Sequence, residues 1–205
     1  MSRIIVLCEG DTEELAVRYF IARQWQSDGL GSVGLDRIIL NGKPQNASKF
    51  AVRYLDNQEV LAVFTLLDLQ GNSQVLHQPN DNFDAKVRRV REWLRGQVEH
   101  PRANHFFPHV CVHQTEAWIL AEGRALAARL KDPSIVPDPN AEAKNFQNPP
   151  SQRLNELFLR VKKRRYNKVI DGTPLFKAMQ FPPVYDSCKY FRAFYDDLKK
   201  AAGLQ

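Results

Sequence analysis

The sequence has few cysteines, and their spacing excludes the common zinc sites. Cys8, Cys111 and Cys188 are its three cysteines, and no two of them lie close enough along the chain to form a pair of zinc ligands. Cys8 and Cys111 each lie in an apolar run, which predicts reduced thiols buried in strands.

Long apolar segments and phosphate-binding loops are also missing. No run of eighteen apolar residues occurs, so we expect no membrane span. The apolar stretch near the N-terminus is too short for a signal peptide, so we expect a cytoplasmic protein. Without a Gly-x-Gly-x-x-Gly or Walker-type loop, a small-molecule phosphotransferase or nucleotide-binding protein is the least favoured function class.

What the chain does contain is typical of a soluble globular protein with excess positive charge. Hydrophobic residues make up 43% and charged residues 25% of the 205 residues, which is an ordinary balance. The formal net charge is +6, and this favours a polyanionic partner such as a nucleic acid.

Apolar runs alternate with amphipathic segments through the first part of the chain. Strands are predicted at residues 4–8, 36–40, 60–67 and 105–112, and helices at 11–26, 49–56, 83–98 and 113–122. Residues 72–82 are polar and include a proline, which predicts a loop. This alternation predicts an α/β fold, with a mostly parallel sheet of about four strands flanked by helices. Residues 123–150 are rich in proline, so we place a boundary between an α/β domain (1–122) and a helical C-terminal appendage packed on it (123–205).

Two of the predicted strands end in carboxylates. Glu9 follows the first strand and Asp68 the third, and parallel strands collect their ligands at their carboxyl ends. If the two strands are neighbours, both carboxylates face one crevice, where Mg²⁺ or Mn²⁺ would offset their repulsion. Glu13 lies one helical turn beyond the first strand and could face the same crevice. The alternative is an ordinary capped strand–helix turn in which Glu9 is an incidental loop residue.

Other charged residues have two possible roles. Glu116 opens the helix after the fourth strand, where it would either bind a metal or complement the helix dipole. Arg88 and Arg91 belong to a basic helix that is either a solvated face or a nucleic-acid contact. A denser basic run on the appendage offers the same choice between solvation and phosphate contact. It consists of Lys162, Lys163, Arg164 and Arg165.

Three motifs resemble a known family. The stretch from Glu9 to Glu14 looks like the strand-terminal Glu-Gly motif of TOPRIM domains, and Asp68-Leu69-Gln70-Gly71 occupies the place of their Asp-x-Asp. The stretch from Gln114 to Glu122 resembles the Glu-x-Trp-Leu-Leu-Ala-Asp signature of the domain-of-unknown-function 4276 family, a group of small bacterial TOPRIM-like proteins.

The resemblance implies a TOPRIM-like fold and a metal-dependent nuclease that hydrolyses RNA or DNA. Its relatives include overcoming-lysogenization-defect nucleases and anti-phage systems, often encoded beside an ATPase. That implies an effector of phage defence or a toxin system, with nucleic acid and an ATPase as candidate partners. By position, Glu9 would act as metal ligand or general acid/base. Asp68 and Glu13 would be further ligands, Glu116 a ligand of a second metal, and Lys168 a stabiliser of phosphate charge.

One position departs from the family pattern. Gln70 stands where the second Asp of Asp-x-Asp usually lies. An amide oxygen can bind Mg²⁺ but carries no negative charge, so metal affinity should fall. This keeps open the alternative of a non-catalytic TOPRIM-like module that binds a partner ATPase or a nucleic acid.

Overall fold

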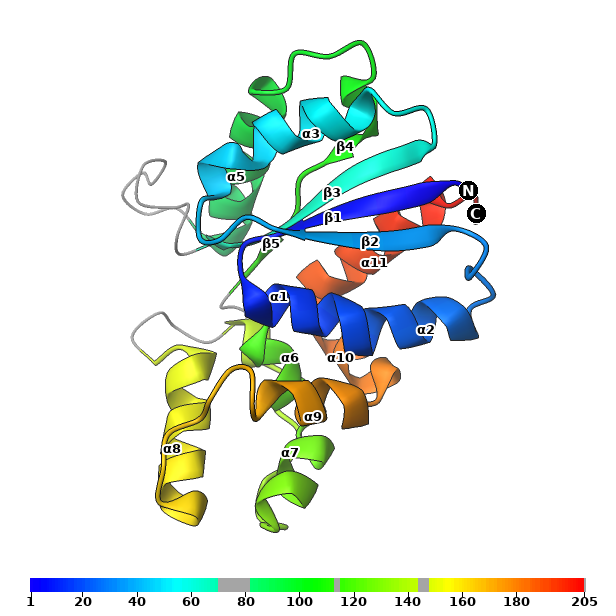
Figure 1. The fold of residues 1–205 in the computed structure, drawn as a ribbon. Coiled ribbons are helices and arrows are strands. Elements are labelled where there is room, and N and C mark those ends of the chain that lie inside the picture. Colours follow the sequence, from blue (N-terminus) through cyan, green and yellow to red (C-terminus); the bar gives the residue numbers. More distant parts are fainter. Residues whose placement is uncertain (70–81, 113–114, 144–147, 205) are drawn as a thin grey trace.

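The centre of the molecule is a parallel sheet. In the computed structural model, residues 1–69, 82–112, 115–143 and 148–204 are described. The strands found there are β1 (Arg3–Cys8), β2 (Gly34–Ile39), β3 (Val60–Asp68), β4 (Phe106–Phe107) and β5 (Val110–Cys111). Their order is β2-β1-β3-β4, with β5 also paired to β3 (Figure 1), and every pairing is parallel. The predicted α/β fold is therefore confirmed.

The strand order reverses between β1 and β3. The chain passes from β1 to β2 on one side and then returns to place β3 on the other side of β1. Cys8 is paired with Leu66 in the register, and the backbone N–H of Glu9 donates to the carbonyl of Leu66 (3.2 Å). The carboxyl ends of β1 and β3 therefore meet at the switch point, where α/β sheets usually bind ligands.

Helices cover both faces of the sheet because alternate strand residues point to opposite sides. Ile4 and Val6 of β1 belong to one buried cluster and Ile5 and Leu7 to the other. The first face is covered by a continuous helical segment and by α11 (Lys189–Ala201). That segment comprises α1 (Asp11–Leu15), the π-helical η1 (Ala16–Ile21) and α2 (Ala22–Ser27). The second face is covered by α3 (Ala47–Leu55) and α5 (Phe83–Gly96).

The remaining helices gather beside α1 and α2, on the lower side of Figure 1. They are α6 (Glu116–Glu122), α7 (Arg124–Leu130), α8 (Pro150–Lys162), α9 (Gly172–Ala178) and α10 (Phe181–Ser187). Short 3₁₀ turns complete the described elements: η2 (Pro44–Asn46), η3 (Ala103–His105) and η4 (Ala141–Ala143). Within the described ranges, no helix has both the length and the apolar composition needed to cross a membrane.

The boundary predicted at residue 123 marks a change of direction within one core. Gly123 links α6 to α7 at a φ of 62°, and a Cβ there would lie 2.7 Å from the Pro137 backbone, so glycine is required. The cluster that contains Ile4 also contains Phe158 and Phe194. The C-terminal helices thus share their core with the sheet.

The predicted strand at 105–112 is split into β4 and β5 for a local reason. Pro108 lies between them and has no N–H to donate to a ladder. The hydroxyl of Thr65 on β3 bridges this gap. It accepts from the N–H of His109 (2.9 Å) and donates to the carbonyl of His109 (2.8 Å). Cys8 and Cys111 are free and buried, as predicted. The loop expected at 72–82 lies almost wholly outside the described residues.

Candidate active site

Glu9 and Asp68 meet at the switch point of the sheet. Glu9 directly follows β1 and Asp68 is the last residue of β3. The backbone N–H of Asp68 donates to Oε2 of Glu9 (2.8 Å), which ties the two strand ends together. Both residues line a cavity of about 250 Å³. The sequence-based expectation that their side chains converge on one crevice agrees with this placement.

Glu13 reaches the same cavity from the first turn of α1. Its Oε2 accepts from the N–H of Gly10 (3.1 Å), so the carboxylate also closes the start of the helix. The side chain is buried. Burial raises the pKa of Glu13 to about 8, and the negative charges of Glu116 and Glu9 act in the same direction. Near neutral pH this carboxyl group is therefore mainly protonated.

Lys168 brings the positive charge of the site. It lines the cavity, and its Nζ lies 3.3 Å from Oε1 of Glu116, which is fully buried. Burial tends to lower the pKa of Lys168, but the carboxylates of Glu116 and Glu13 outweigh it and raise that pKa. Burial raises the pKa of Glu116, and the charge of Lys168 only partly offsets this. Glu116 does not line the cavity itself but forms an ion pair with Lys168, which does.

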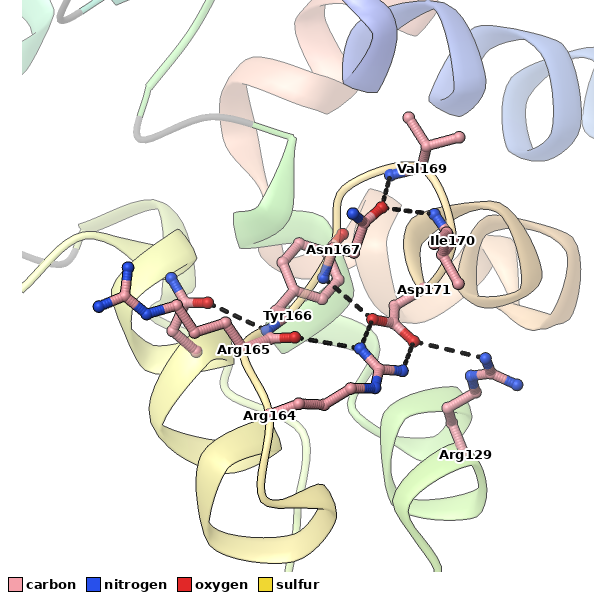
Figure 2. Close-up of polar contacts among 9 residues, drawn as sticks. Arg129, Arg164, Arg165, Tyr166, Asn167, Val169, Ile170 and Asp171 are labelled. Carbon is pink, nitrogen blue, oxygen red and sulfur yellow. Dashed lines mark hydrogen bonds and ion pairs between the residues drawn. The ribbon is translucent and has the colours of Figure 1, made fainter.

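A buried carboxylate holds the loop that carries Lys168. Figure 2 shows Asp171, which accepts two hydrogen bonds from Arg164 (2.6 and 2.7 Å) and one from the Asn167 N–H (2.9 Å). Arg129 donates a longer hydrogen bond to the same carboxylate (3.4 Å). Oδ1 of Asn167 accepts from the N–H groups of Val169 and Ile170 (3.0 and 2.8 Å). Lys168 therefore sits in a turn that is fixed from both sides.

The Asp171 carboxylate is ionised in this setting. Burial raises its pKa, but the hydrogen bonds from Arg164 and Asn167 outweigh burial and hold the pKa below its usual range. This buried charge and its partners, here called the Asp171 brace, comprise Asp171, Arg164, Arg129 and Asn167.

Comparison with known proteins identifies the family. A model of the domain of unknown function DUF4276 matches residues 8–199. The chain belongs to the DUF4276 family. Among solved structures, the C-terminal region of the Burkholderia pseudomallei OLD protein aligns over 99% of this chain and 100% of its own, with a TM-score of 0.51 and 16% identity. The corresponding region of the Xanthomonas campestris pv. campestris OLD protein aligns over 98% and 97%, with a TM-score of 0.49 and 16% identity.

At this level of identity the Burkholderia structure informs the fold alone, and it agrees with the predicted TOPRIM-like arrangement. The curated proteins give no match. The predicted membership of this DUF4276 protein is thus confirmed by the family match, independently of any activity.

The predicted metal ligands of this DUF4276 protein are only partly gathered. Glu9, Glu13 and Asp68 line the cavity, and Glu116 lies beside it. Gln70 lies outside the described residues. Among those that are described, no group of three His, Cys, Asp or Glu side chains is arranged to hold a metal ion. A cation here would take one or two of these carboxylates together with other ligands such as water, which is how proteins commonly bind Mg²⁺.

The chemistry of the donors nevertheless suits a hard cation. Carboxylate oxygens are the ligands that Mg²⁺ and Mn²⁺ prefer. Both carboxylate oxygens of Glu116 are buried and, among the described residues, lack a hydrogen bond of good geometry beyond the ion pair with Lys168. Glu13 is buried beside them, and its burial and the negative charge of Glu116 raise its pKa.

The predicted nucleic-acid residues are not among the residues that line this cavity. Arg164 is engaged by Asp171, and its guanidinium also lies 5.5 Å from the ring centre of Phe158. Lys163 ends α8 in a left-handed conformation (φ 57°). Arg88 and Arg91 lie on α5 and line a different cavity. Nucleic-acid contact through these arginines and through Lys162, Lys163 and Arg165 stays a prediction, and for Arg164 the structure provides a structural role.

Several residues of the site had no sequence signal. Asp171 and Arg129 are 42 positions apart and meet only in the folded chain. Gly42 and Val169 line the cavity because of where their loops run, whereas Asp11 and Thr12 line it from the first turn of α1, within the motif that begins at Glu9. The spacing of Asn167 and Asp171 is compatible with a local turn, but spacing alone does not tell such a turn from a solvated loop.

Proposed function

We propose that this protein is a nuclease that depends on a divalent cation and hydrolyses the phosphodiester bonds of RNA or DNA, acting as the effector of a phage-defence or toxin system. The observation that carries the proposal is the cavity at the switch point, which the carboxyl groups of Glu9, Glu13 and Asp68 line together with Lys168. The resemblance of these motifs to TOPRIM nucleases supports it.

Each residue has a defined task in this proposal. Glu9 and Asp68, joined by the hydrogen bond between them, would hold Mg²⁺ or Mn²⁺ at the switch point, with Glu13 beside them. A bound cation supplies charge neutralisation and a more acidic water. Lys168, held by the Asp171 brace, would contact a phosphate oxygen and offset charge that develops during cleavage. Gln70 and Glu116 remain candidate further ligands.

A cleavage assay with labelled RNA and DNA, single- and double-stranded, tests the proposal. We expect cleavage with Mg²⁺ or Mn²⁺ and none in EDTA. Glu9→Ala should abolish it. Glu9→Gln should do the same while keeping an oxygen that can accept from the Asp68 N–H.

The matched control is Glu156→Gln, which removes one carboxylate from the exposed surface of α8. It should cleave like the unaltered protein. Cleavage that persists in EDTA, or full activity in both Glu9 variants, would refute the mechanism.

One observation favours a second function. Gln70 replaces an expected acidic residue, so the same fold could serve as a module that binds a partner ATPase or a nucleic acid without catalysis. Titration calorimetry separates the two functions. Heat from Mg²⁺ or Mn²⁺ that disappears in Glu9→Gln supports the nuclease. Tight binding of the partner with no detectable cation binding supports the module.

A further inference from the structure

A second cavity lies between α5 and α11. Its volume is about 440 Å³, against about 250 Å³ for the cavity at the switch point. The lining residues that the structure describes all come from these two helices. The helices cover opposite faces of the sheet and both contact β5, so they approach each other beside that strand. We call this cavity the α5–α11 groove.

Arginines from one face of α5 line the groove. Arg88, Arg91 and Arg95 are spaced by three and four residues, so their side chains project from the same side of the helix. Seven residues correspond to about 10 Å along a helix axis. Arg88 and Arg95 are exposed, and Arg91 is half-buried between them.

Two carboxylates, Glu92 and Asp84, line the groove against the three arginines and Lys189, so the lining keeps an excess of positive charge. Glu92 lies between Arg91 and Arg95 in the sequence and is exposed. Asp84 lines the groove, but its Oδ1 accepts from Lys189 (2.6 Å) and from the hydroxyl of Tyr190 (2.7 Å). Asp197 lies 3.9 Å from Arg91 and also binds His109 (3.1 Å). Burial lowers the pKa of Arg91 and the charge of Arg95 lowers it further. Arg95 therefore repels Arg91, and an anion bound between them would relieve that repulsion.

The position of the groove suits a ligand that extends toward the switch-point cavity. Because α5 connects the carboxyl end of β3 to the amino end of β4, its first turns lie at the edge of the sheet that carries Glu9 and Asp68. An extended molecule in the groove would continue toward that edge.

We propose that the α5–α11 groove binds the phosphate backbone of a nucleic-acid strand whose continuation reaches the switch-point cavity. Guanidinium groups match phosphate oxygens in geometry and charge. Contacts of this kind carry no sequence information and position the strand. The inference rests on the nucleic-acid substrate of the proposed function, but not on catalysis.

Binding without cleavage provides the test. A fluorescent oligonucleotide, RNA or DNA, is titrated with Arg88→Ala/Arg95→Ala in EDTA at several salt concentrations. We expect binding several-fold weaker than that of the unaltered protein. The plot of log affinity against log salt has a negative slope, and its steepness should decrease by about 1.4 in the variant. Each phosphate contact to a single strand contributes about 0.7, and the variant removes two arginines.

The matched control is Lys49→Ala/Arg53→Ala on α3, which removes the same number of charges from exposed positions on the same face of the sheet. It should keep the original slope. Equal loss in both variants, no loss in either, or binding of an acidic peptide but no oligonucleotide would overturn the groove assignment. Loss of cleavage in Glu9→Gln with intact oligonucleotide binding would leave the groove supported and bear on the nuclease alone.

Discussion

At the scale of single residues, the most informative group is the carboxyl of Glu13. It lies in a cavity that could accept a cation, yet its pKa of about 8 leaves it mainly protonated at neutral pH. Burial contributes most to this shift, followed by the negative charge of Glu116. A cation that binds to Glu13 must therefore displace its proton.

Proton release should accompany cation binding if Glu13 is a ligand. At pH 7 we expect about one proton released per Mg²⁺ or Mn²⁺ bound, and less above pH 8, where the group is already ionised. Apparent affinity should rise with pH up to about 8 and then level off. Calorimetry in two buffers with different ionisation enthalpies measures the release. Glu13→Gln should remove both the release and this pH dependence, and identical heats in the two buffers would exclude Glu13 as a ligand.

Individual site residues could be predicted where they lie directly at the end of an apolar strand. Glu9 and Asp68 each follow an apolar run directly, so their approach depended only on β1 and β3 being neighbours. Asp171 was not predictable in this way. Its charge is stabilised by Arg164, seven residues earlier, and by Arg129 of α7, which reaches it only through the packing of α7 against α9.

At the scale of elements, the loop at residues 163–171 shows how a basic run can be structural. Arg164 lies in the run that suggested phosphate contact, but its guanidinium binds a buried carboxylate. Arg160, one turn earlier on α8, forms an exposed pair with Asp132. The two arginines lie four residues apart in a basic stretch, but Arg164 binds a buried carboxylate and Arg160 forms an exposed pair.

Arg164→Ala should therefore be the more costly substitution. It leaves the buried Asp171 carboxylate without its main partner, so the free energy of unfolding should fall more than in Arg160→Ala, which breaks only an exposed pair with Asp132. Urea unfolding of the two variants measures the difference. Equal losses would mean that the Asp171 brace does not stabilise the loop.

The effect of pH on this difference follows from the lowered pKa of Asp171. A carboxyl whose pKa is lower in the folded than in the unfolded chain adds stability above its unfolded pKa. That contribution disappears as pH falls through the folded value. The gap between the two variants should accordingly narrow in acid.

Most elements could be predicted because their periodicity is local. The run at residues 60–67 is apolar throughout and forms β3, which is covered on both faces. The division of the fourth strand into β4 and β5 could not be predicted with equal certainty. It depends on Pro108 and also on a hydroxyl of β3, 44 residues away, that bonds His109.

At the scale of the whole molecule, one buried cluster contains residues from both sides of the boundary predicted at residue 123. Phe194 of α11 packs edge-on against Phe64 of β3, with ring centres 5.9 Å apart, and both are buried. The change of composition near residue 123 was visible in the sequence. The return of α11 to the sheet was not, because amphipathic spacing does not specify which surface a helix covers.

A single unfolding transition should result. Circular dichroism and tryptophan fluorescence should report the same curve in urea, as expected for two-state unfolding. Phe194→Ala should shift both curves together and cost about 3–5 kcal/mol, the usual range for truncating a buried phenylalanine. Two separate transitions, or a shift confined to one probe, would show that residues 123–205 unfold on their own.

The split between β4 and β5 also bears on how copies of this protein behave toward one another. Exposed sheet edges attract strands from other molecules, and short or proline-interrupted edges resist such pairing. Here the last strands in the order are two residues each and flank Pro108, while Thr65 occupies backbone groups of His109 that could otherwise pair. The interruption at Pro108 therefore also protects this edge of the folded sheet against pairing with strands of other copies.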